Sequence, residues 1–223
     1  MNNSLHFSSA KQNWATRFGT FYSIQEELGR DYLIDPCAEH ETAKCDLYIT
    51  KEDDMFNVGR FRDHFNLEHS EGMHPLEEVH VFANPEYSRQ QVKFVKEFIR
   101  QTELDGNLVI DVLVPAKTDT QLFHDVILKH ATSISFIRGR LTFGSDAYWE
   151  ELWEREFLED GRKNTLYGQH GKMNPAAFPS MVVSFGEKLG NGKKQPLSIE
   201  PLVLTKARYP DRIATLNKEN INE

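Results

Sequence analysis

The run from Leu108 to Val114, LVIDVLV, is apolar except for one aspartate. A continuous apolar run of this length is typical of a strand buried inside a sheet. Further short β-type runs alternate along the chain with segments of helical spacing. This alternation predicts an α/β fold, in which helices cover both faces of one sheet.

The expected strands are Tyr32–Ile34, Leu47–Thr50, Val79–Ala83, Leu108–Val114, Ile134–Ile137 and Met181–Phe185. Amphipathic spacing predicts helices at Ser88–Gln101, with Ser88 as N-cap, and at Thr120–His130. A chain of 223 residues is expected to form one domain, residues 1–223.

Residues 145–174 interrupt this alternation. Trp149, Trp153 and Phe157 lie at i, i+4 and i+8, which predicts one packed face of a helix. The polar, glycine-punctuated stretch that follows them predicts a loop inserted before the last strands.

The expected strand Val79–Ala83 ends at Asn84-Pro85-Glu86-Tyr87. The Asn84 side-chain oxygen and the Pro85 carbonyl are two neutral acceptors that could hold both hydrogens of a planar NH2 group. Tyr87 supplies a face on which a base could stack. Asn-Pro is also a common turn dipeptide, so a plain turn with a packed tyrosine is the structural alternative.

Six short motifs follow one another in a defined order: Trp14–Thr16; Leu33–Ala38 with Ala43–Cys45; Asn84–Ser88; Val114–Thr120; Phe136–Phe143; and Phe178–Ser180. Together they resemble the phage-type DNA N-6-adenine methyltransferase (Dam-like) family, over a region from about Trp14 to Phe185. The resemblance implies a Rossmann-like, S-adenosylmethionine-dependent methyltransferase sheet, with residues 145–174 as an inserted target-recognition segment. The chain departs from the usual (Asn/Asp)-Pro-Pro-(Tyr/Phe) motif, because Glu86 replaces the second proline.

The implied activity is methylation of the adenine N6 amine in double-stranded DNA, with S-adenosylmethionine as cofactor. The target adenine would flip out of the duplex and meet Asn84, Pro85 and Tyr87, which are the implied catalytic residues. RNA adenine and protein glutamine present similar planar groups and remain alternative substrates. A non-catalytic DNA- or protein-binding descendant is a further alternative, which Glu86 keeps open.

The implied cofactor-binding residues are Trp14, Thr16, Asp35, Cys37, Ala38 and Asp53. Asp35 follows the first strand, where open α/β sheets bind ligands, and would meet the methionyl ammonium. Asp53 follows the second strand and would accept the ribose hydroxyls. A capping aspartate at Asp35 and a solvated acidic turn at Asp53 are the structural alternatives.

The implied DNA-contacting residues are Ser88, Arg138, Arg140, Arg162 and Lys163. Arg138 and Arg140 would clamp phosphates or line the flipped-base channel, and surface ion pairs are the alternative. The net charge of −8 argues against a global positive field that coats nucleic acid, but not against a local basic face.

Other features limit the functional classes. No apolar run approaches the ~20 residues that span a bilayer, so no membrane partner is expected. His64, His69, His74 and His80 lack metal-ligand spacing, which predicts no metal site. Cys37 and Cys45 form no motif, which favours a reduced cytoplasmic setting, the host cytoplasm if the chain is phage-encoded. The sequence leaves the recognised DNA site and the oligomeric state open.

Overall fold

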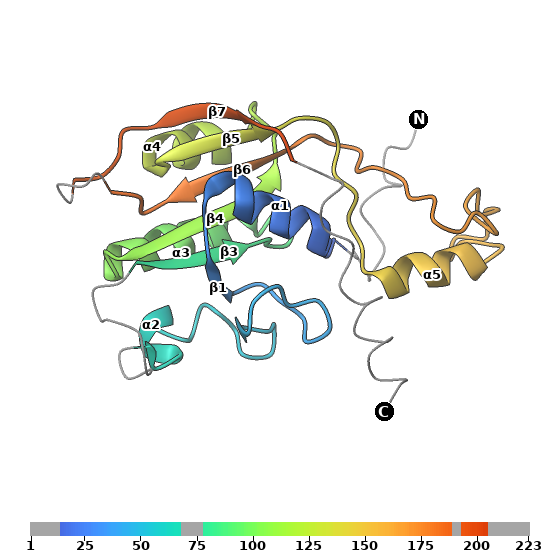
Figure 1. The fold of residues 1–223 in the computed structure, drawn as a ribbon, viewed down its shortest axis with the longest axis horizontal. Helices are drawn as coiled ribbons and strands as arrows, with labels where there is room; N and C mark the ends of the chain where they lie inside the picture. The colour runs from blue at the N-terminus through green and yellow to red at the C-terminus, as the bar shows by residue number, and fades with distance from the viewer. Residues whose placement is uncertain (1–13, 68–77, 189–192, 205–223) are drawn as a thin grey trace.

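The computed structural model of the protein describes residues 14–67, 78–188 and 193–204. Within these ranges seven strands form one sheet (Figure 1). The strands are β1 (Tyr32–Asp35), β2 (Leu47–Tyr48), β3 (Val79–Ala83), β4 (Leu108–Pro115), β5 (Ser133–Ile137), β6 (Ser180–Phe185) and β7 (Ser198–Leu202). The helices are α1 (Phe18–Leu28), α2 (Phe61–His64), α3 (Gln91–Leu104), the π-helical η2 (Leu122–Ile127), α4 (Leu128–His130) and α5 (Asp146–Glu154).

The strand order is β2-β1-β3-β4-β6-β5-β7. The pairs β1–β2, β1–β3, β3–β4 and β5–β7 are parallel, and β6 is antiparallel to both β4 and β5. All strands but β6 therefore run in one direction and end at one side of the sheet, here called the carboxyl edge. The opposite side is the amino edge. This topology confirms the predicted Rossmann-like α/β sheet.

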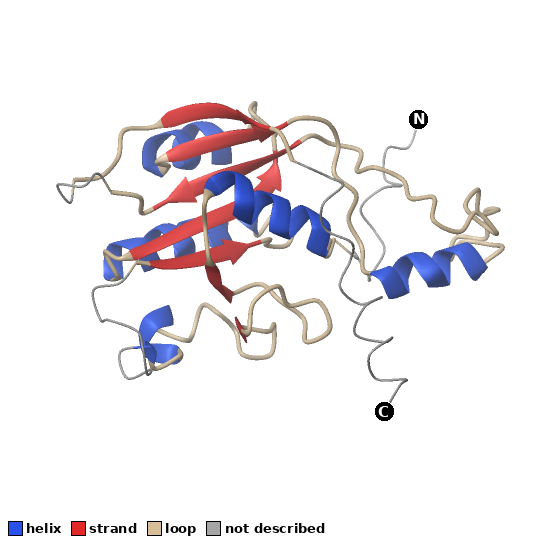
Figure 2. Cartoon of the chain, viewed as in Figure 1, coloured by secondary structure: helices blue, strands red, loops and turns tan. Residues whose placement is uncertain are grey.

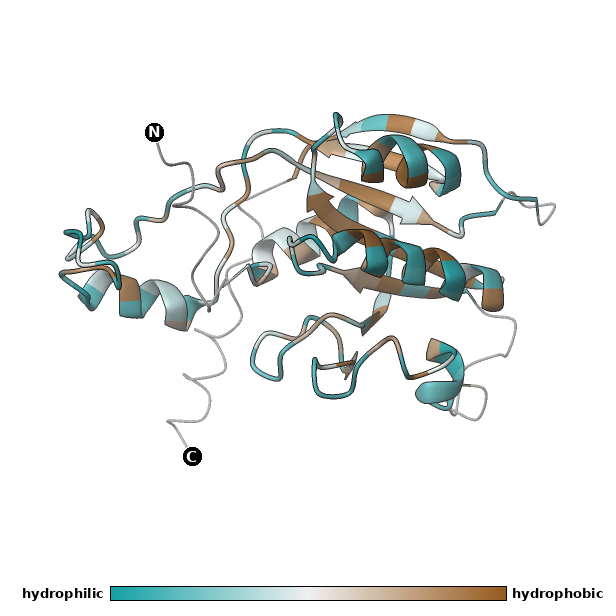
Figure 3. Cartoon of the chain, turned by 180° about the vertical axis from the view of Figure 1, so that it is seen from behind, coloured by the Kyte–Doolittle hydropathy of each residue, from teal (hydrophilic) through white to brown (hydrophobic). Residues whose placement is uncertain are grey.

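Helices cover both faces of the sheet (Figure 2): α1 lies on one face, and α3 with α4 on the other. β4 contributes side chains to the hydrophobic core on both faces of the sheet. Ile110, Val112 and Val114 pack in the same core cluster as residues of α3, whereas Leu113 packs in the cluster that contains residues of α1. Figure 3 shows the sheet from the α3 side, with mostly hydrophobic central strands behind helices of mixed hydropathy. Burial on both faces explains why β4 reads as an unbroken apolar run.

Most predicted elements lie within two residues of the observed ones. The helix after β3 is an exception, since it begins at Gln91 and ends at Leu104, about three residues later than expected. Ser88 instead accepts a hydrogen bond from the Gln90 amide at 3.1 Å, in the turn before the helix. The segment Thr120–His130 is helical as predicted, but most of it takes the wider π-helical turn.

Three elements were not predicted from the sequence: α1, the short helix α2, and β7. α1 (FGTFYSIQEEL) contains glycine, threonine and several aromatic residues, which are weak helix formers. It is held by burial of Phe21 and Ile24, and it ends at Gly29, whose φ of 62° allows its amide to bond back to the last turn. β7 is the outermost strand of the sheet and, among the described strands, pairs only with β5. Most of its side chains are exposed, and its sequence accordingly lacks the apolar run that marks a buried strand.

The arm, residues 145–174, leaves the sheet beyond the carboxyl edge and consists of α5 and irregular chain (Figure 1). The prediction of one packed stripe is wrong at its end, because α5 stops at Glu154. Trp149 is 5% exposed and donates to the Phe143 carbonyl at 3.0 Å, whereas Phe157 is 54% exposed. Asn164 donates to the carbonyls of Leu152 and Arg155 at 2.6 and 2.8 Å, and so folds the chain back onto the helix.

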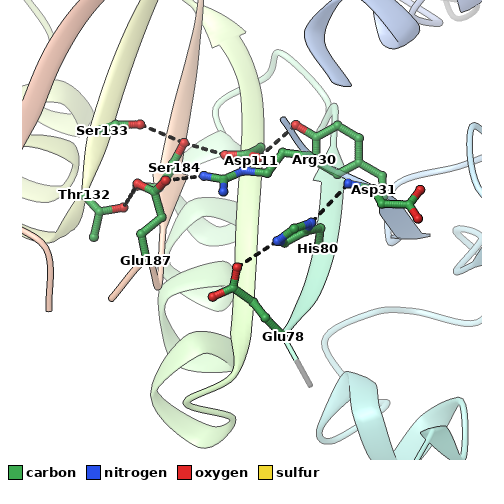
Figure 4. Close-up of polar contacts among 10 residues, drawn as sticks. Arg30, Asp31, Glu78, His80, Asp111, Thr132, Ser133, Ser184 and Glu187 are labelled. Atoms are coloured by element: carbon green, nitrogen blue, oxygen red, sulfur yellow. Dashed lines mark hydrogen bonds and ion pairs between the residues drawn. The ribbon is translucent and has the colours of Figure 1, made fainter. Parts of the chain in front are cut away.

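A buried polar network lies toward the amino edge (Figure 4). Asp111, fully buried on β4, accepts hydrogen bonds from Arg30 Nε at 3.1 Å, from the Tyr32 hydroxyl at 2.8 Å and from Ser184. Glu187 pairs with Arg30 and accepts from the hydroxyl of Thr132 at 2.7 Å. These bonds tie the start of β1 to β4, β5 and β6.

Candidate active site

Asn84 and Pro85 directly follow β3 at the carboxyl edge. Asn84 Nδ2 donates to the main-chain carbonyl of Trp14 at 2.7 Å. The other end of the amide, Oδ1, is buried and accepts no hydrogen bond from any described residue. Pro85 is buried, whereas Glu86 is exposed. The strand end thus presents an acceptor without a donor.

Tyr87 belongs to a cluster of four aromatic rings, the others being Trp14, Phe143 and Phe178. Its ring centroid lies 5.6, 5.9 and 5.5 Å from those three, in that order. The Tyr87 hydroxyl is buried and has no partner within the described ranges. Burial raises the pKa of this hydroxyl, so it stays neutral. The four rings come from four separate segments and surround the residues after β3.

More buried polar atoms in this region lack partners in the described part of the chain: Trp14 Nε1, Thr16 Oγ1 and Ser180 Oγ. Arg60 Nε and Gln91 Nε2 are also without partners among the described residues, and Gln91 lies at the start of α3, shortly after Tyr87. Buried polar groups in native proteins are nearly always hydrogen-bonded. Several orphans gathered at one edge of an open sheet therefore indicate where a polar ligand binds.

Asp35 ends β1 and is 4% exposed. Its carboxylate accepts hydrogen bonds from the amides of Cys37 at 3.2 Å and Lys44 at 3.1 Å. Burial raises the pKa of Asp35 to about 6, against the opposing effect of these amides and of the Lys44 ammonium. Burial also lowers the pKa of Lys44 to about 8. Asp35 therefore organises the turn after β1 while keeping a charge that is costly without a cationic partner.

The other implied cofactor residues lie in the loops after β1 and β2. The Ala38 amide donates to the Ile49 carbonyl at 3.1 Å, which continues the pairing of the two strands. Burial raises the pKa of the Cys37 thiol, so it carries no thiolate. Asp53 is exposed, and one of its oxygens accepts from both the amide and the hydroxyl of Thr50, at 3.0 and 2.7 Å. These bonds hold the pKa of Asp53 below its usual range.

The structure separates the two N-terminal residues of the implied cofactor set. Trp14 lies against Asn84 and Tyr87, at the strand end of β3. Thr16 instead lines a small cavity between residues 15–18, the loop 41–44 and the start of the arm, and Lys44 lines the same cavity. Since the Lys44 amide binds Asp35, Thr16 lies on the side of the site where Asp35 is found.

The implied DNA-contacting residues fall into two groups. Arg138 and Arg140 are exposed directly after β5, at the carboxyl edge. Arg162 and Lys163 lie in the arm, where Arg162 forms an exposed ion pair with Asp160 at 2.6 Å. The main-chain bridge between Phe157 and Lys163 shapes this part of the arm.

Some residues of the site were missed by the sequence analysis: Lys44, Phe143, Phe178 and Ser180. All occur within the ordered motifs, but those motifs carry no local sign that their side chains meet. No group of three or more potential metal ligands occurs among the described residues, and His69 and His74 lie outside these ranges. Within the same ranges, no helix has the length and apolar character needed to cross a bilayer.

A parallel sheet with one antiparallel strand and an Asn-Pro-x-Tyr strand end define a Rossmann-like methyltransferase. A model of the DNA N-6-adenine-methyltransferase (Dam) family matches residues 3–157, more than half of the chain. The chain therefore belongs to this family, and its general activity is adenine methylation in DNA. No curated protein matches the chain.

Proposed function

We propose that the protein transfers the methyl group of S-adenosylmethionine to the N6 amine of an adenine flipped out of double-stranded DNA. The observation that carries this proposal is the Asn84 Oδ1 atom, which is buried beside Pro85 and accepts no hydrogen bond from the described part of the chain. The N6 amine brings two hydrogens to this point, one for Asn84 Oδ1 and one for the Pro85 carbonyl.

These two acceptors act on the transition state. The N6 lone pair is delocalised into the purine ring, and it must localise on nitrogen to attack the methyl carbon. Two acceptors aimed at the amine hydrogens favour the pyramidal nitrogen that forms during attack, and they require no reorganisation at that moment. Attack by N6 would form the N–C bond while the C–S bond of the sulfonium breaks with its electron pair on sulfur, and the extra proton on N6 would pass to water.

Tyr87 supplies the stacking contact for the flipped base. A base on an aromatic ring is typically worth about 1–3 kcal/mol, which offsets part of the few kcal/mol spent on unpairing. Ser180 Oγ is buried in the same region without a partner among the described residues, and would offer a polar contact to the edge of the base.

The fit of the cofactor rests on Asp35 and Thr16. A buried carboxylate whose pKa is raised to about 6 is suited to a cationic ligand, and the methionyl ammonium provides that charge. Thr16 Oγ1, unpartnered in the described chain, would bind the same end of the cofactor. Cys37 and Ala38 would border the adenosine moiety, and Asp53 would receive the ribose hydroxyls. S-adenosylmethionine supplies the electrophilic methyl group.

DNA would approach the carboxyl edge, where Arg138, Arg140 and Ser88 contact the backbone near the flipped nucleotide. The arm would read the flanking sequence, because its charge is segregated. Residues 145–160 hold seven acidic residues and one arginine, whereas residues 161–174 hold three basic residues, Arg162, Lys163 and Lys172, and no acid. DNA and S-adenosylmethionine both occur in the cytoplasm, and we place the enzyme there. If the chain is phage-encoded, this is the cytoplasm of the host cell.

The experiment is methyl transfer from tritiated S-adenosylmethionine to unmethylated duplex DNA, followed by nucleoside analysis. N6-methyladenine is the expected product. Asn84→Ala should lower turnover by about 10²–10³-fold, as for other transition-state hydrogen bonds, with cofactor affinity retained. Glu86→Gln, at the exposed neighbour, is the matched control and should keep native turnover. Absence of labelled DNA, with label in RNA or in protein glutamine, would replace the DNA substrate by one of those alternatives.

A further inference from the structure

The Asn84 amide can face the reacting amine in two ways, and only one is productive. Its carbonyl oxygen accepts a hydrogen from the amine, whereas its NH2 group would oppose it donor to donor. The terminal torsion of asparagine has two broad wells that exchange these ends. Some other group must therefore choose the orientation if Asn84 is to act as an acceptor.

The main-chain carbonyl of Trp14 determines the orientation of the Asn84 amide. It lies 2.7 Å from Asn84 Nδ2, and a carbonyl can only accept. A rotated amide would bring two oxygens together at this contact and would leave the NH2 group buried where Oδ1 now lies. Both changes are unfavourable, because an unpaired buried polar group loses its hydration without compensation.

The strap, residues 14–17, is itself fixed in place. The indole of Trp14 packs between Tyr87, Phe143 and Phe178, at centroid distances of 5.3–5.6 Å. The Ala15 carbonyl accepts from the Gly144 amide at 2.8 Å, and Thr16 forms a main-chain bridge with Phe143.

The end of the strap is anchored to the start of the arm. Arg17 pairs with Asp146 at 2.7 Å. Gly144 is required beside this anchor, since its φ is 107° and a Cβ there would lie 2.8 Å from the Tyr148 ring. The position of the Trp14 carbonyl is thus set by the arm on one side and by the aromatic cluster on the other.

We propose that the Trp14 carbonyl is a positioning group, which locks the Asn84 amide with its oxygen toward the target amine. This inference rests on the proposed function and adds to it. The strap then orients the group that binds the reacting amine, in addition to contributing Thr16 to the cofactor side of the site. It also accounts for the choice of asparagine in this chain, where an ionised aspartate would set its charge against the Trp14 carbonyl.

Asn84→Asp provides a test because it is isosteric and its effect depends on pH. In its protonated form, the introduced carboxyl can donate its O–H to the Trp14 carbonyl and present its C=O to the amine, as the amide does. In its ionised form it repels the carbonyl, so the strap contact is lost. Burial beside a carbonyl should raise the pKa of this carboxyl above the ordinary value of about 3.9.

The measured quantity is the single-turnover rate of methyl transfer at saturating DNA, taken as the ratio of variant to native between about pH 5 and pH 9. For Asn84→Asp the ratio should rise by about tenfold or more toward low pH. For Asn84→Ala it should stay flat, because that side chain does not titrate. The neighbouring titratable groups Tyr87 and Glu86, and the Arg17–Asp146 pair, are unchanged in all three proteins, so their effects cancel.

A ratio for Asn84→Asp that is flat, or that rises with pH as for a carboxylate acting alone, would overturn the positioning role while leaving the proposed function intact. A native protein that transfers no methyl group to DNA would remove the proposed function itself, and this inference with it. Calorimetry with S-adenosylhomocysteine should give the same affinity for native protein and variants.

A second variant tests the same bond if Asn84→Asp does not fold. Replacing Ala15 by its hydroxy-acid analogue turns the Trp14 carbonyl into an ester carbonyl, a weaker acceptor, and keeps every side chain. The transfer rate should fall severalfold with unchanged cofactor affinity. The same replacement at Ala147, exposed in the first turn of α5, is the matched control. Equal rates for the two esters would exclude the role of the Trp14 carbonyl.

Discussion

The two edges of the sheet bury similar polar side chains but differ in whether these side chains are hydrogen-bonded. Toward the amino edge, the Tyr32 hydroxyl donates to Asp111 at 2.8 Å, and Ser184 binds both Asp111 and Ser133. At the carboxyl edge, the buried hydroxyls of Tyr87 and Ser180 have no partner among the described residues. The comparison distinguishes polar groups that hold the fold together from polar groups that the described fold leaves unpaired.

Ser180 and Ser184 make the contrast within one strand, since both lie on β6 and both are 1% exposed. The hydroxyl of Ser184, toward the amino edge, is hydrogen-bonded, whereas the equally buried hydroxyl of Ser180, at the carboxyl edge, has no partner among the described residues. Unsatisfied buried groups reduce stability, and proteins tend to keep such exceptions at functional sites. Variants at the two edges should therefore act on different quantities.

The largest expected effect is on stability at the amino edge. Arg30→Met removes the cation from fully buried Asp111, and breaking such a pair from one side typically costs about 3–5 kcal/mol of unfolding free energy. Arg162→Met, which opens the exposed pair with Asp160, is the control and should leave the free energy of unfolding nearly unchanged. Denaturant unfolding measures both. If Arg30→Met unfolded like the native protein, the network would not hold this edge.

Two tyrosine variants compare the edges directly. Tyr32→Phe removes a donor from buried Asp111 and should reduce the free energy of unfolding by about 1–3 kcal/mol. Tyr87→Phe removes a hydroxyl that has no described partner, so stability should stay the same or rise. Chemical denaturation without ligand measures both variants. Equal losses would show that the Tyr87 hydroxyl is paired within the fold.

A smaller effect concerns Asp35 and pH. Its ionised form should bind the cofactor ammonium, so affinity should fall about tenfold for each pH unit below its pKa of about 6. For the folding stability of the ligand-free protein, the pH effect of Asp35 has the opposite sign. Because its pKa is raised in the folded state, Asp35 favours folding most at low pH, and this contribution is lost as pH rises through about 6. Asp35→Asn should abolish the pH dependence of affinity, as measured by calorimetry. Native affinity that does not change across this range would assign Asp35 to the turn alone.

The smallest effect concerns DNA contact at the carboxyl edge. Arg140→Gln should lower the slope of log affinity against log salt by about one, as expected for one lost phosphate contact. Arg100 lies on α3 and pairs with Glu97 at 2.6 Å, so Arg100→Gln should leave the slope unchanged. Salt titrations with a fixed duplex measure the slopes. Equal slopes for native protein and Arg140→Gln would make Arg140 a surface residue without a phosphate partner.

Several features of the fold were predictable from the sequence because they are local. β3, β4 and β5 are short apolar runs, and Asn84 follows directly from where β3 ends. The order of the motifs also indicated the family. α1 was missed because its first two turns consist of weak helix formers such as glycine, threonine and aromatic residues. The end of α5 was misplaced because the i+8 spacing to Phe157 continues the pattern beyond Glu154, where the helix ends.

The amino-acid sequence alone was therefore enough to predict β1 to β6, the strand-end motif and the chemistry that Asn84 and Tyr87 can offer. Which buried polar groups find partners depends on the packing of the folded chain. Asn84 meets the Trp14 carbonyl across 70 residues of chain, and Arg30 meets Asp111 across 81. Local propensity depends on near neighbours along the chain, whereas these bonds depend on how β-strands, strap and arm pack. The same packing leaves Asn84 Oδ1 without a partner in the described chain, and so available to a substrate.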